Sequence, residues 1–228
     1  MNIKTCLSIT AFAALFAIHP ANAAPPSESL SLGGLKFGES PSAAAAAAST
    51  LGIKLTKTTN YNQTGTIAPS IAFEEYGDAY DNSLKIQYSR ITQKIVAISR
   101  QIKFPKPIPL PEMQKSVAAR FGRETSGPKY NYNFERNSMH QFAWDREGTV
   151  VQTVRCDVHL LPIRTSESNC GTAASSSLIS QDGYVTGQSI VAVDWATLHD
   201  EIVKANASAS ALRKKQMEEA AKNSIPKL

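Results

Sequence analysis

Residues 40–52 read SPSAAAAAASTLG and predict one complete short helix. Ser40 can cap the free amide groups at its start, and Pro41 suits the first helical position because proline has no amide hydrogen to leave unpaired there. The six alanines favour helix because their side chains lose no rotamer entropy. Gly52 ends the helix, since glycine readily adopts the left-handed conformation of a C-terminal cap. The alanine face is small, so the element packed on it comes close.

Strand patterns surround this helix, because apolar and polar residues alternate on both sides of it. The strand candidates are Leu32–Phe37, a strand starting at Ile53–Leu55, then Ile67–Phe73, Leu84–Tyr88 and Lys94–Phe104, the last with Val96, Ile98, Ile102 and Phe104 on one face. Residues 24–104 are therefore predicted to form one helix packed on an antiparallel sheet.

Residues 105–111 carry a proline at every second position. Alternating prolines favour a stiff, extended connection that cannot join a central strand, because proline lacks the amide hydrogen of a ladder bond. We expect a rigid spacer here. The alternative is a docking motif for a domain that binds proline-rich segments.

Residues 112–193 repeat the plan of a helix followed by strands. The helix is indicated by Leu110, Met113, Val117 and Phe121, which share one helical face, and by Gly122, which ends it. The strand candidates are His140–Trp144, Val150–Leu160 and Ser189–Val193, with Arg146–Glu147–Gly148 as a turn. Residues 167–180 are rich in Ser, Ala and Gly, and we expect them to be irregular.

Residues 194–228 predict a final helix capped by Asp194 or Thr197. The expected buried side is Leu198, Ile202, Ala205, Ala209 and Leu212, and the end beyond it is expected to fray or project. The predicted fold class is α+β: two tandem units of one helix packed on an antiparallel sheet, plus a C-terminal helix.

Residues 1–23 have the three-part layout of a secretory signal. Lys4 lies in the charged start, an apolar run extends from Leu7 to Ile18, and Ala21 and Ala23 occupy the two small-residue positions of a cleavage site. We expect cleavage after Ala23 and a periplasmic or secreted mature protein. No other apolar stretch approaches the roughly 20 residues of a membrane span.

The cysteines agree with export. Cys6 leaves with the signal, and the residues before it do not form a lipoprotein processing site, so no lipid anchor is expected. Cys156 and Cys170 remain, and two cysteines in an oxidising compartment most simply form a disulfide. The alternative is a zinc or redox pair, but the sequence has no Cys-x-x-Cys.

A family resemblance rests on Gly38-x-Ser40-Pro41 entering a helix that stops at Gly52, with antiparallel strands after it. Phe121–Gly122 closes the second helix in a similar way. This pattern resembles the helix-plus-meander module of exported bacterial proteins, used once in the small lipoprotein family of the outer-membrane barrel-assembly machinery and twice in the β-lactamase inhibitor protein family. The chain lacks the anchor cysteine of the first, and no segment matches the inhibitory loops of the second. The resemblance implies a non-catalytic module that contacts proteins.

Charge and motifs exclude several classes of function. The net charge of +5 is spread along the chain, whereas nucleic-acid binders concentrate positive charge on one face. No phosphate loop, dinucleotide fingerprint, His-Glu-x-x-His or Gly-x-Ser-x-Gly elbow occurs. We therefore expect no nucleic-acid partner, no cofactor, no metal and no catalytic residue.

Two weaker signals each have a plainer explanation. Asp157 and His159 lie two residues apart, so a carboxylate could orient an imidazole; the plainer reading is an exposed strand face. Glu74, Glu75, Asp78 and Asp81 lack the ligand spacing of a calcium loop, and a solvated turn is expected instead. Paired carboxylates of a glycosidase need not be close in the sequence, so a hydrolase stays an alternative.

The candidate binding residues lie in the polar loop between residues 123 and 137. Tyr130, Tyr132 and Phe134 alternate there and are flanked by Lys129 and Arg136. Exposed, three rings on one strand face would grip a sugar or a peptide; buried, they are core.

The sequence thus predicts an exported, soluble, non-catalytic binding or scaffold protein of the bacterial cell envelope, with an envelope protein as its partner. The alternatives are a hydrolase acting on cell-wall glycan or peptide, and an inhibitor of a secreted enzyme. The oligomeric state stays open.

Overall fold

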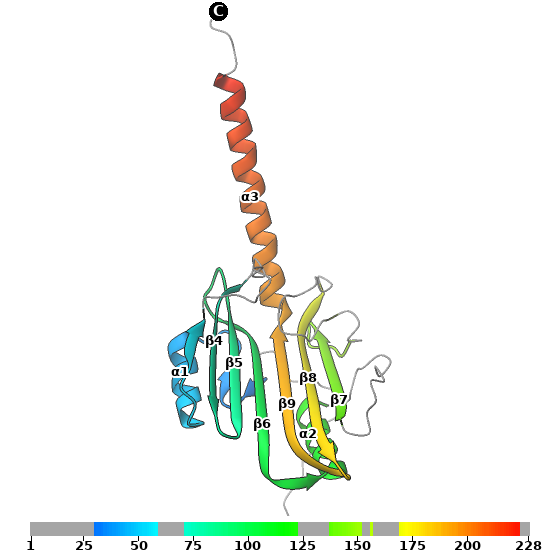
Figure 1. Ribbon diagram of the computed structural model, residues 1–228. Coiled ribbons are helices and arrows are strands. Elements are labelled where there is room, and N and C mark those ends of the chain that lie inside the picture. Colours follow the sequence, from blue (N-terminus) through cyan, green and yellow to red (C-terminus); the bar gives the residue numbers. More distant parts are fainter. Residues whose placement is uncertain (1–29, 59–70, 123–136, 152–155, 157–168, 224–228) are drawn as a thin grey trace, which may run out of the picture.

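The computed structural model describes residues 30–58, 71–122, 137–151, 156 and 169–223 (Figure 1). Within these ranges the chain forms three helices and nine strands. In chain order they are β1 Ser31–Leu32, β2 Leu35–Lys36, α1 Pro41–Thr50, β3 Thr56–Thr58, β4 Ile71–Ala79, β5 Asn82–Ser89, β6 Ile95–Pro109, α2 Leu110–Phe121, β7 Asn137–Asp145, β8 Cys170–Gln181, β9 Tyr184–Asp194 and α3 Trp195–Asn223.

Seven of the strands form one antiparallel sheet in the order β3-β4-β5-β6-β9-β8-β7. β6 and β9 lie at its centre and join the two halves of the chain, with Ala97 opposite Val193 and Lys103 opposite Gly187. The protein is therefore α+β with an antiparallel sheet and a C-terminal helix, as the sequence predicted (Figure 1).

Helix α1 confirms the prediction made from residues 40–52. The Ser40 hydroxyl accepts a hydrogen bond from the Ala43 amide, and Pro41 occupies the first turn. Gly52 follows the helix with φ of +71°, the left-handed conformation expected of a glycine cap. Ala44 and Ala48 are fully buried, so the small alanine face lets α1 approach the core closely.

Helix α2 also follows its sequence pattern. Met113, Val117 and Phe121 are buried, and Gly122 ends the helix with φ of +77°. The helix begins at Leu110, before the expected boundary at residue 112, because Pro111 fits the first helical turn, where amide hydrogens have no helical partner.

The segment Leu32–Phe37, expected as one strand, is a small hairpin. β1 and β2 pair with each other, and Gly33 and Gly34 form the turn between them with φ of +64° and +86°. Two consecutive positive φ angles reverse the chain, which explains why the paired glycines make a turn and do not simply loosen a strand.

The proline-rich segment corrects a second expectation, because it continues the central strand β6. β5 pairs with β6 only as far as Ile102, so beyond it β6 has β9 as its one neighbour. The pairing with β9 is interrupted between Lys103 and Ile108, and Pro105 and Pro107 fall in that interval. They therefore remove no ladder bond, and the segment is extended, as expected, without being a separate spacer.

Residues 170–180, which belong to the segment 167–180 expected to be irregular, lie in the long strand β8. Its neighbours β7 and β9 pair with its backbone on both edges, and residues 170–176 are all buried. Small side chains suit this crowded position: a Cβ at Gly171 would lie 2.2 Å from the carbonyl oxygen of Asp145. Packing and pairing thus override the low strand propensity of Ser, Ala and Gly.

Other strand boundaries also shift. The strand expected from Ile53 begins at Thr56, and β9 starts at Tyr184, before the expected Ser189. Val96 sits at a bulge, since Ile95 lies opposite Tyr88 and Ala97 opposite Gln87. It therefore packs in a different cluster from Ile98, with which it was expected to share a face.

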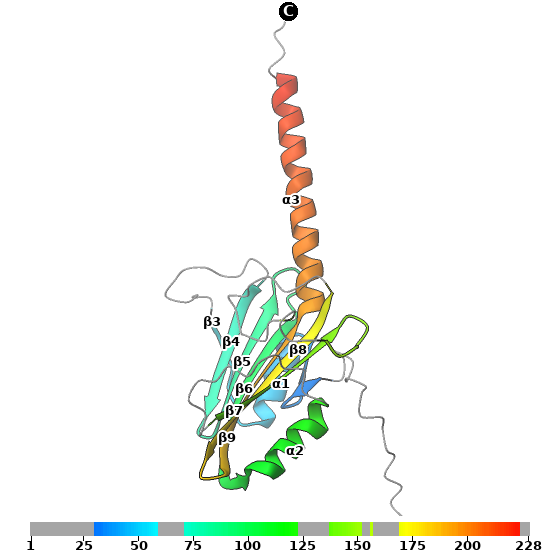
Figure 2. The same cartoon turned by 90° about the vertical axis from the view of Figure 1, so that its right-hand side faces the viewer.

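The sheet has one fully covered face. Helices α1 and α2 and the β1–β2 hairpin pack there, on a core that includes Leu84, Ile86 and Tyr88. Figure 2 shows both helices on the same side of the sheet. A smaller cluster lies on the opposite face, where the start of α3 contributes Trp195 and Leu198.

Helix α3 leaves the body after about two turns. Leu198 and Glu201 are buried, but Ile202 is 37% exposed and Leu212 58% exposed. The expected burial of residues 202–212 on the body is therefore wrong, and the helix projects as a single rod (Figures 1 and 2).

Truncation after Leu212 is expected to change the free energy of unfolding by no more than about 0.5 kcal/mol, because the removed part of α3 buries almost nothing on the body. Urea unfolding of the mature and truncated chains at low protein concentration measures this difference. A loss above about 2 kcal/mol would contradict the arrangement of α3 described here.

Candidate binding surfaces

The sequence candidates for binding lie outside the described residues. Lys129, Tyr130, Tyr132, Phe134 and Arg136 fall in residues 123–136, and Asp157 and His159 fall in residues 157–168. The aromatic loop and the Asp–His pair stay predictions. Most of the strand expected from Val150 to Leu160 also falls there; Val150 makes an isolated bridge to Trp144, and Cys156 lies in a bend.

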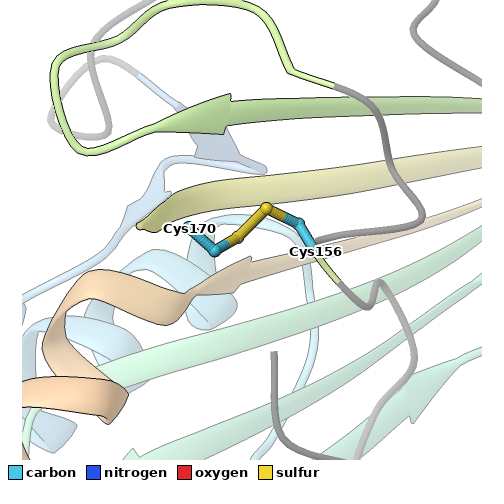
Figure 3. Close-up of a disulfide and its surroundings, with 2 residues drawn as sticks. All are labelled: Cys156 and Cys170. Carbon is cyan, nitrogen blue, oxygen red and sulfur yellow. A yellow bond between two sulfur atoms is a disulfide. The ribbon is translucent and has the colours of Figure 1, made fainter. Parts of the chain in front are cut away.

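Cys156 and Cys170 are joined in a disulfide whose Cα atoms lie 5.7 Å apart (Figure 3). Both residues are buried, with 1% and 2% exposure. Cys170 is the first residue of β8, so the bond ties the bend at Cys156 to the end of the sheet next to α3. The disulfide is a structural link, because both cysteines are buried away from solvent.

The acidic residues weighed as a calcium-like loop lie mainly in a strand. Glu74, Glu75 and Asp78 belong to β4, and only Asp81 lies in the turn after it, so the expected solvated turn is wrong for three of the four. Neighbouring residues of a strand point to opposite faces, which separates the carboxylates of Glu74 and Glu75.

Each of these two carboxylates has a partner on the adjacent strand β5. Glu74 forms an ion pair with Lys85 at 3.0 Å and accepts a hydrogen bond from Gln87, while the Tyr88 hydroxyl donates to Glu75. Burial and the nearby Glu75 raise the pKa of Tyr88 far above its usual value. Within the described residues no three His, Cys, Asp or Glu side chains gather as a metal site would require.

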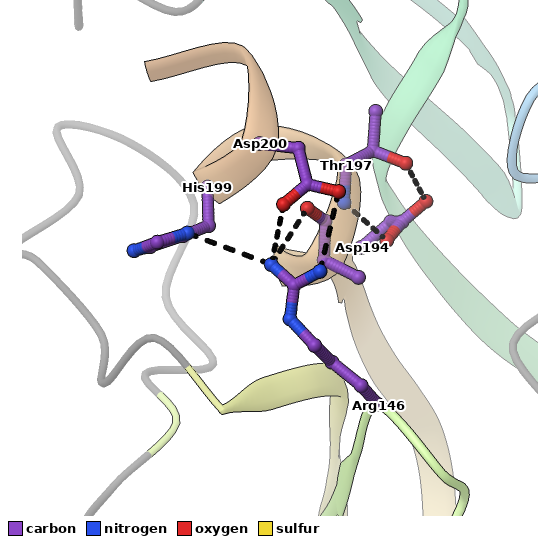
Figure 4. Close-up of polar contacts among 6 residues, drawn as sticks. Arg146, Asp194, Thr197, His199 and Asp200 are labelled. Carbon is purple, nitrogen blue, oxygen red and sulfur yellow. Dashed lines mark hydrogen bonds and ion pairs between the residues drawn. The ribbon is translucent and has the colours of Figure 1, made fainter. Parts of the chain in front are cut away.

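A polar cluster, which we call the root clamp, fixes the start of α3 (Figure 4). Asp194 caps the helix by accepting hydrogen bonds from the Thr197 amide at 3.1 Å and the Thr197 hydroxyl at 2.7 Å. Arg146, in the turn after β7, donates to both carboxylate oxygens of Asp200 at 2.7 and 3.2 Å. One of its nitrogens also donates to the Ala196 carbonyl and lies 3.5 Å from Nδ1 of His199.

The surroundings of the root clamp shift the pKa values of two of its carboxyl groups. The hydrogen bond from Arg146 lowers the pKa of the Asp200 carboxyl, whereas burial raises the pKa of Asp194. On the other side of the helix, the Ser89 hydroxyl donates to the buried carboxylate of Glu201. The cluster holds the start of α3 at a fixed position on the sheet. Within it, Arg146 binds Asp200 and Asp194 binds Thr197.

The second face of the sheet carries a broad polar surface. Strand alternation fixes its members, since residues of this face alternate with the buried residues that meet α1 and α2. We call it the open face; its partly or fully exposed members away from α3 are Tyr76, Ser83, Lys85, Ser99, Gln101, Lys103, Met139, Ser177, Ile179 and Ser189.

The open face has small polar side chains at its centre and large apolar ones toward its sides. Ser177 and Ser189 are direct neighbours on β8 and β9 and are partly exposed. Ile179, Met139 and Tyr76 are 50%, 47% and 46% exposed, the first two on β8 and β7 and the third on β4. A surface with apolar residues at the sides of a polar centre can contact another protein.

This surface was missed at the sequence level for a specific reason. Ser177 and Ile179 lie in the segment expected to be irregular. Apolar and polar residues do not alternate there, since polar Ser176 is buried and apolar Ile179 is exposed, so the sequence carries no strand signal for this surface.

Comparison with protein families, curated proteins and solved structures finds no match to this chain. Among the described residues, no helix combines the length and apolar character needed to cross a membrane.

Proposed function

We propose that this chain is an exported, non-catalytic binding protein of the bacterial cell envelope that contacts a protein partner through the open face. The observation that carries the proposal is the asymmetry of the sheet: α1, α2 and the β1–β2 hairpin cover one face, while the other face is buried near the start of α3 and carries partly or fully exposed side chains away from it. A sheet held rigid by a core on one side is a suitable platform for binding on the other.

We further infer that the body consists of two tandem units, α1 with β3 to β6 and α2 with β7 to β9. The order of a helix followed by an antiparallel meander occurs twice along the chain, and β6 and β9 join the two meanders. This organisation is the one implied by the resemblance to exported helix-plus-meander proteins, and it makes the open face a single surface shared by both units.

Binding by the open face is tested with Ser189→Arg. Ser189 lies at the centre of the sheet, so a long charged side chain there should obstruct a docked protein and weaken capture of its partner by about tenfold or more. Crosslinking and pull-down from envelope extract, quantified by mass spectrometry, measures the capture. The matched control is Ser49→Arg on the exposed side of α1, which should capture the partner as the unchanged chain does. Equal loss in both variants would contradict the proposal.

Export is tested by the mass of the mature protein. Because Ala21 and Ala23 occupy the small-residue positions of a cleavage site, the periplasmic form is expected to begin at Ala24 and to carry no lipid. Intact-mass analysis of protein from a periplasmic extract measures both features. Retention of residues 1–23, or a diacylglycerol adduct, would contradict this expectation.

A hydrolase of cell-wall glycan or peptide and an inhibitor of a secreted enzyme are the competing functions. An inhibitor would use the open face in the same way, and identification of a secreted enzyme as the captured partner would establish it. A hydrolase would instead lose activity in Asp157→Asn or His159→Gln, while Ser189→Arg would leave catalysis of a small substrate unchanged.

A further inference from the structure

Arg100 is a charged residue on the covered face of the sheet. Its neighbours on β5 and β9 are Leu84 and Ile190, which are both buried in the core beneath α1 and α2. Directly paired residues of an antiparallel sheet point to the same face, so the side chain of Arg100 lies on this side as well, partly buried. An arginine in such a place normally has an anionic partner, because removing its charge from water is costly.

The described residues supply Arg100 with a neutral partner instead. Its Nε donates a hydrogen bond to the side-chain oxygen of Asn82 at 3.0 Å. Its Nη1 lies against Gly33, in the turn of the β1–β2 hairpin, where a Cβ would come to 2.9 Å from that nitrogen. Glycine at this position therefore makes room for the guanidinium group. Within the described ranges no carboxylate forms an ion pair with Arg100.

A second guanidinium group reaches the same hairpin from α2. Arg120 is exposed in the last turn of that helix and donates a hydrogen bond to the carbonyl of Ser31, two residues before Gly33. A cation in the last turn suits the helix dipole, but the dipole does not explain why this one approaches Arg100. In the part of the chain that the structure describes, Arg120 also has no carboxylate as an ion-pair partner.

The two cations are close enough to affect each other. Burial lowers the pKa of Arg100, and the charge of Arg120 lowers it further. Like charges repel, so an anion bound to both groups would stabilise the arrangement. Guanidinium groups present planar N–H pairs that match the oxygens of a phosphate or a carboxylate. Two positive charges match a phosphate monoester, which carries about −1.5 to −2 at pH 7, better than the single charge of a carboxylate.

We propose that Arg100 and Arg120 form a binding site for a phosphate group beside the β1–β2 hairpin. The terminal nitrogens of both side chains bind the phosphate oxygens, while Asn82 orients the guanidinium group of Arg100 through its Nε. The site lies on the covered side of the sheet, so it is separate from the open face and does not depend on the proposed protein partner. Inorganic phosphate and the phosphate headgroup of a lipid present the same chemistry to it.

Calorimetric titration of the mature protein with inorganic phosphate at constant ionic strength tests the site. We expect one phosphate per chain, bound more tightly at pH 8 than at pH 5, because phosphate loses its second charge on acidification. Arg120→Gln should weaken binding by about tenfold or more, since it removes charge-assisted hydrogen bonds. The matched control is Lys115→Gln, which removes another exposed cation of α2 and should bind phosphate as the unchanged chain does.

Arg100→Lys tests the second guanidinium group. This variant keeps the positive charge but loses the planar N–H pair and the hydrogen bond from Nε to Asn82, so it should also weaken binding. Because Arg120 is exposed, Arg120→Gln should melt as the unchanged chain does and stays informative if Arg100→Lys does not fold. Phosphate binding that is undiminished in Arg120→Gln overturns the proposal, and so does acetate binding as tight as that of phosphate.

Two arms of the experiment separate the sources of the phosphate group. Co-sedimentation with vesicles of phosphatidylcholine and phosphatidic acid, lost in Arg120→Gln and competed by inorganic phosphate, would establish a lipid headgroup. Binding of inorganic phosphate without co-sedimentation would establish free phosphate, and binding in neither arm overturns the proposal. Ser189→Arg should leave phosphate binding unchanged, so failure of this site and failure of the open face are distinguishable.

Discussion

Replacement of Phe142 by Ala is expected to lower the free energy of unfolding by about 3–5 kcal/mol, enough to remove a large part of the stability of a typical domain. Phe142 is 1% exposed and lies on β7 between two other rings. Its centroid is 4.9 Å from that of Phe121 on α2 and 6.3 Å from that of Trp144. Truncation would therefore leave a cavity between α2 and the sheet, which neighbouring strands cannot close.

Urea unfolding followed by tryptophan fluorescence measures this loss, and Trp144 reports directly on the site. The matched control is Tyr80→Ala, which removes an aromatic ring that is 96% exposed in the turn between β4 and β5. It should change the free energy of unfolding by no more than about 0.5 kcal/mol. A loss below about 1 kcal/mol for Phe142→Ala would show that α2 does not pack on β7 as described.

Removal of the disulfide is expected to lower the free energy of unfolding by about 3 kcal/mol in the chain-entropy model. The bond between Cys156 and Cys170 closes a short loop and so reduces the conformational entropy of the unfolded chain. The double variant Cys156→Ala/Cys170→Ala should unfold at a lower urea concentration than the oxidised protein. The reduced, unchanged chain should behave like the variant, which separates loss of the bond from loss of the sulfur atoms.

The same experiment contains a direct check on the pairing. Protein that begins at Ala24, unfolded but unreduced, should show no free thiol in an Ellman titration, since Cys6 lies in the expected signal. Two free thiols, or a variant as stable as the oxidised protein, would contradict the disulfide.

Local chemistry predicted the helices better than the strands. Ser40 acts through its side-chain hydroxyl, Pro41 and Gly52 act through their own backbones, and the spacing of Met113, Val117 and Phe121 repeats with the helix itself. Such signals are complete within a few residues, so no knowledge of the rest of the fold was needed. The start of α3 was predicted for the same reason, because Asp194 caps the helix that follows it.

Strand β8 and the proline-rich end of β6 depended on neighbours that are distant in the sequence. Ser, Ala and Gly form a strand in β8 because β7 and β9 flank it, and Pro105 is tolerated because β5 has already ended. The open face could not be predicted without β8, since its centre lies on that strand. The length of α3 on the body was also overestimated, because an apolar stripe does not specify what it packs against.

The pairing of β6 with β9 has a consequence for how the protein folds. The two central strands come from opposite halves of the chain, with Ala97 opposite Val193, so the sheet has high contact order and its closure is slow. Until β9 has formed and paired with it, β6 has an unpaired edge. A chain that crosses a membrane from its N-terminus would thus emerge with an unfinished sheet, and completion would await its last strand. Fragments that end before Tyr184 should accordingly associate through the edge of β6, which makes β9 essential for a soluble product.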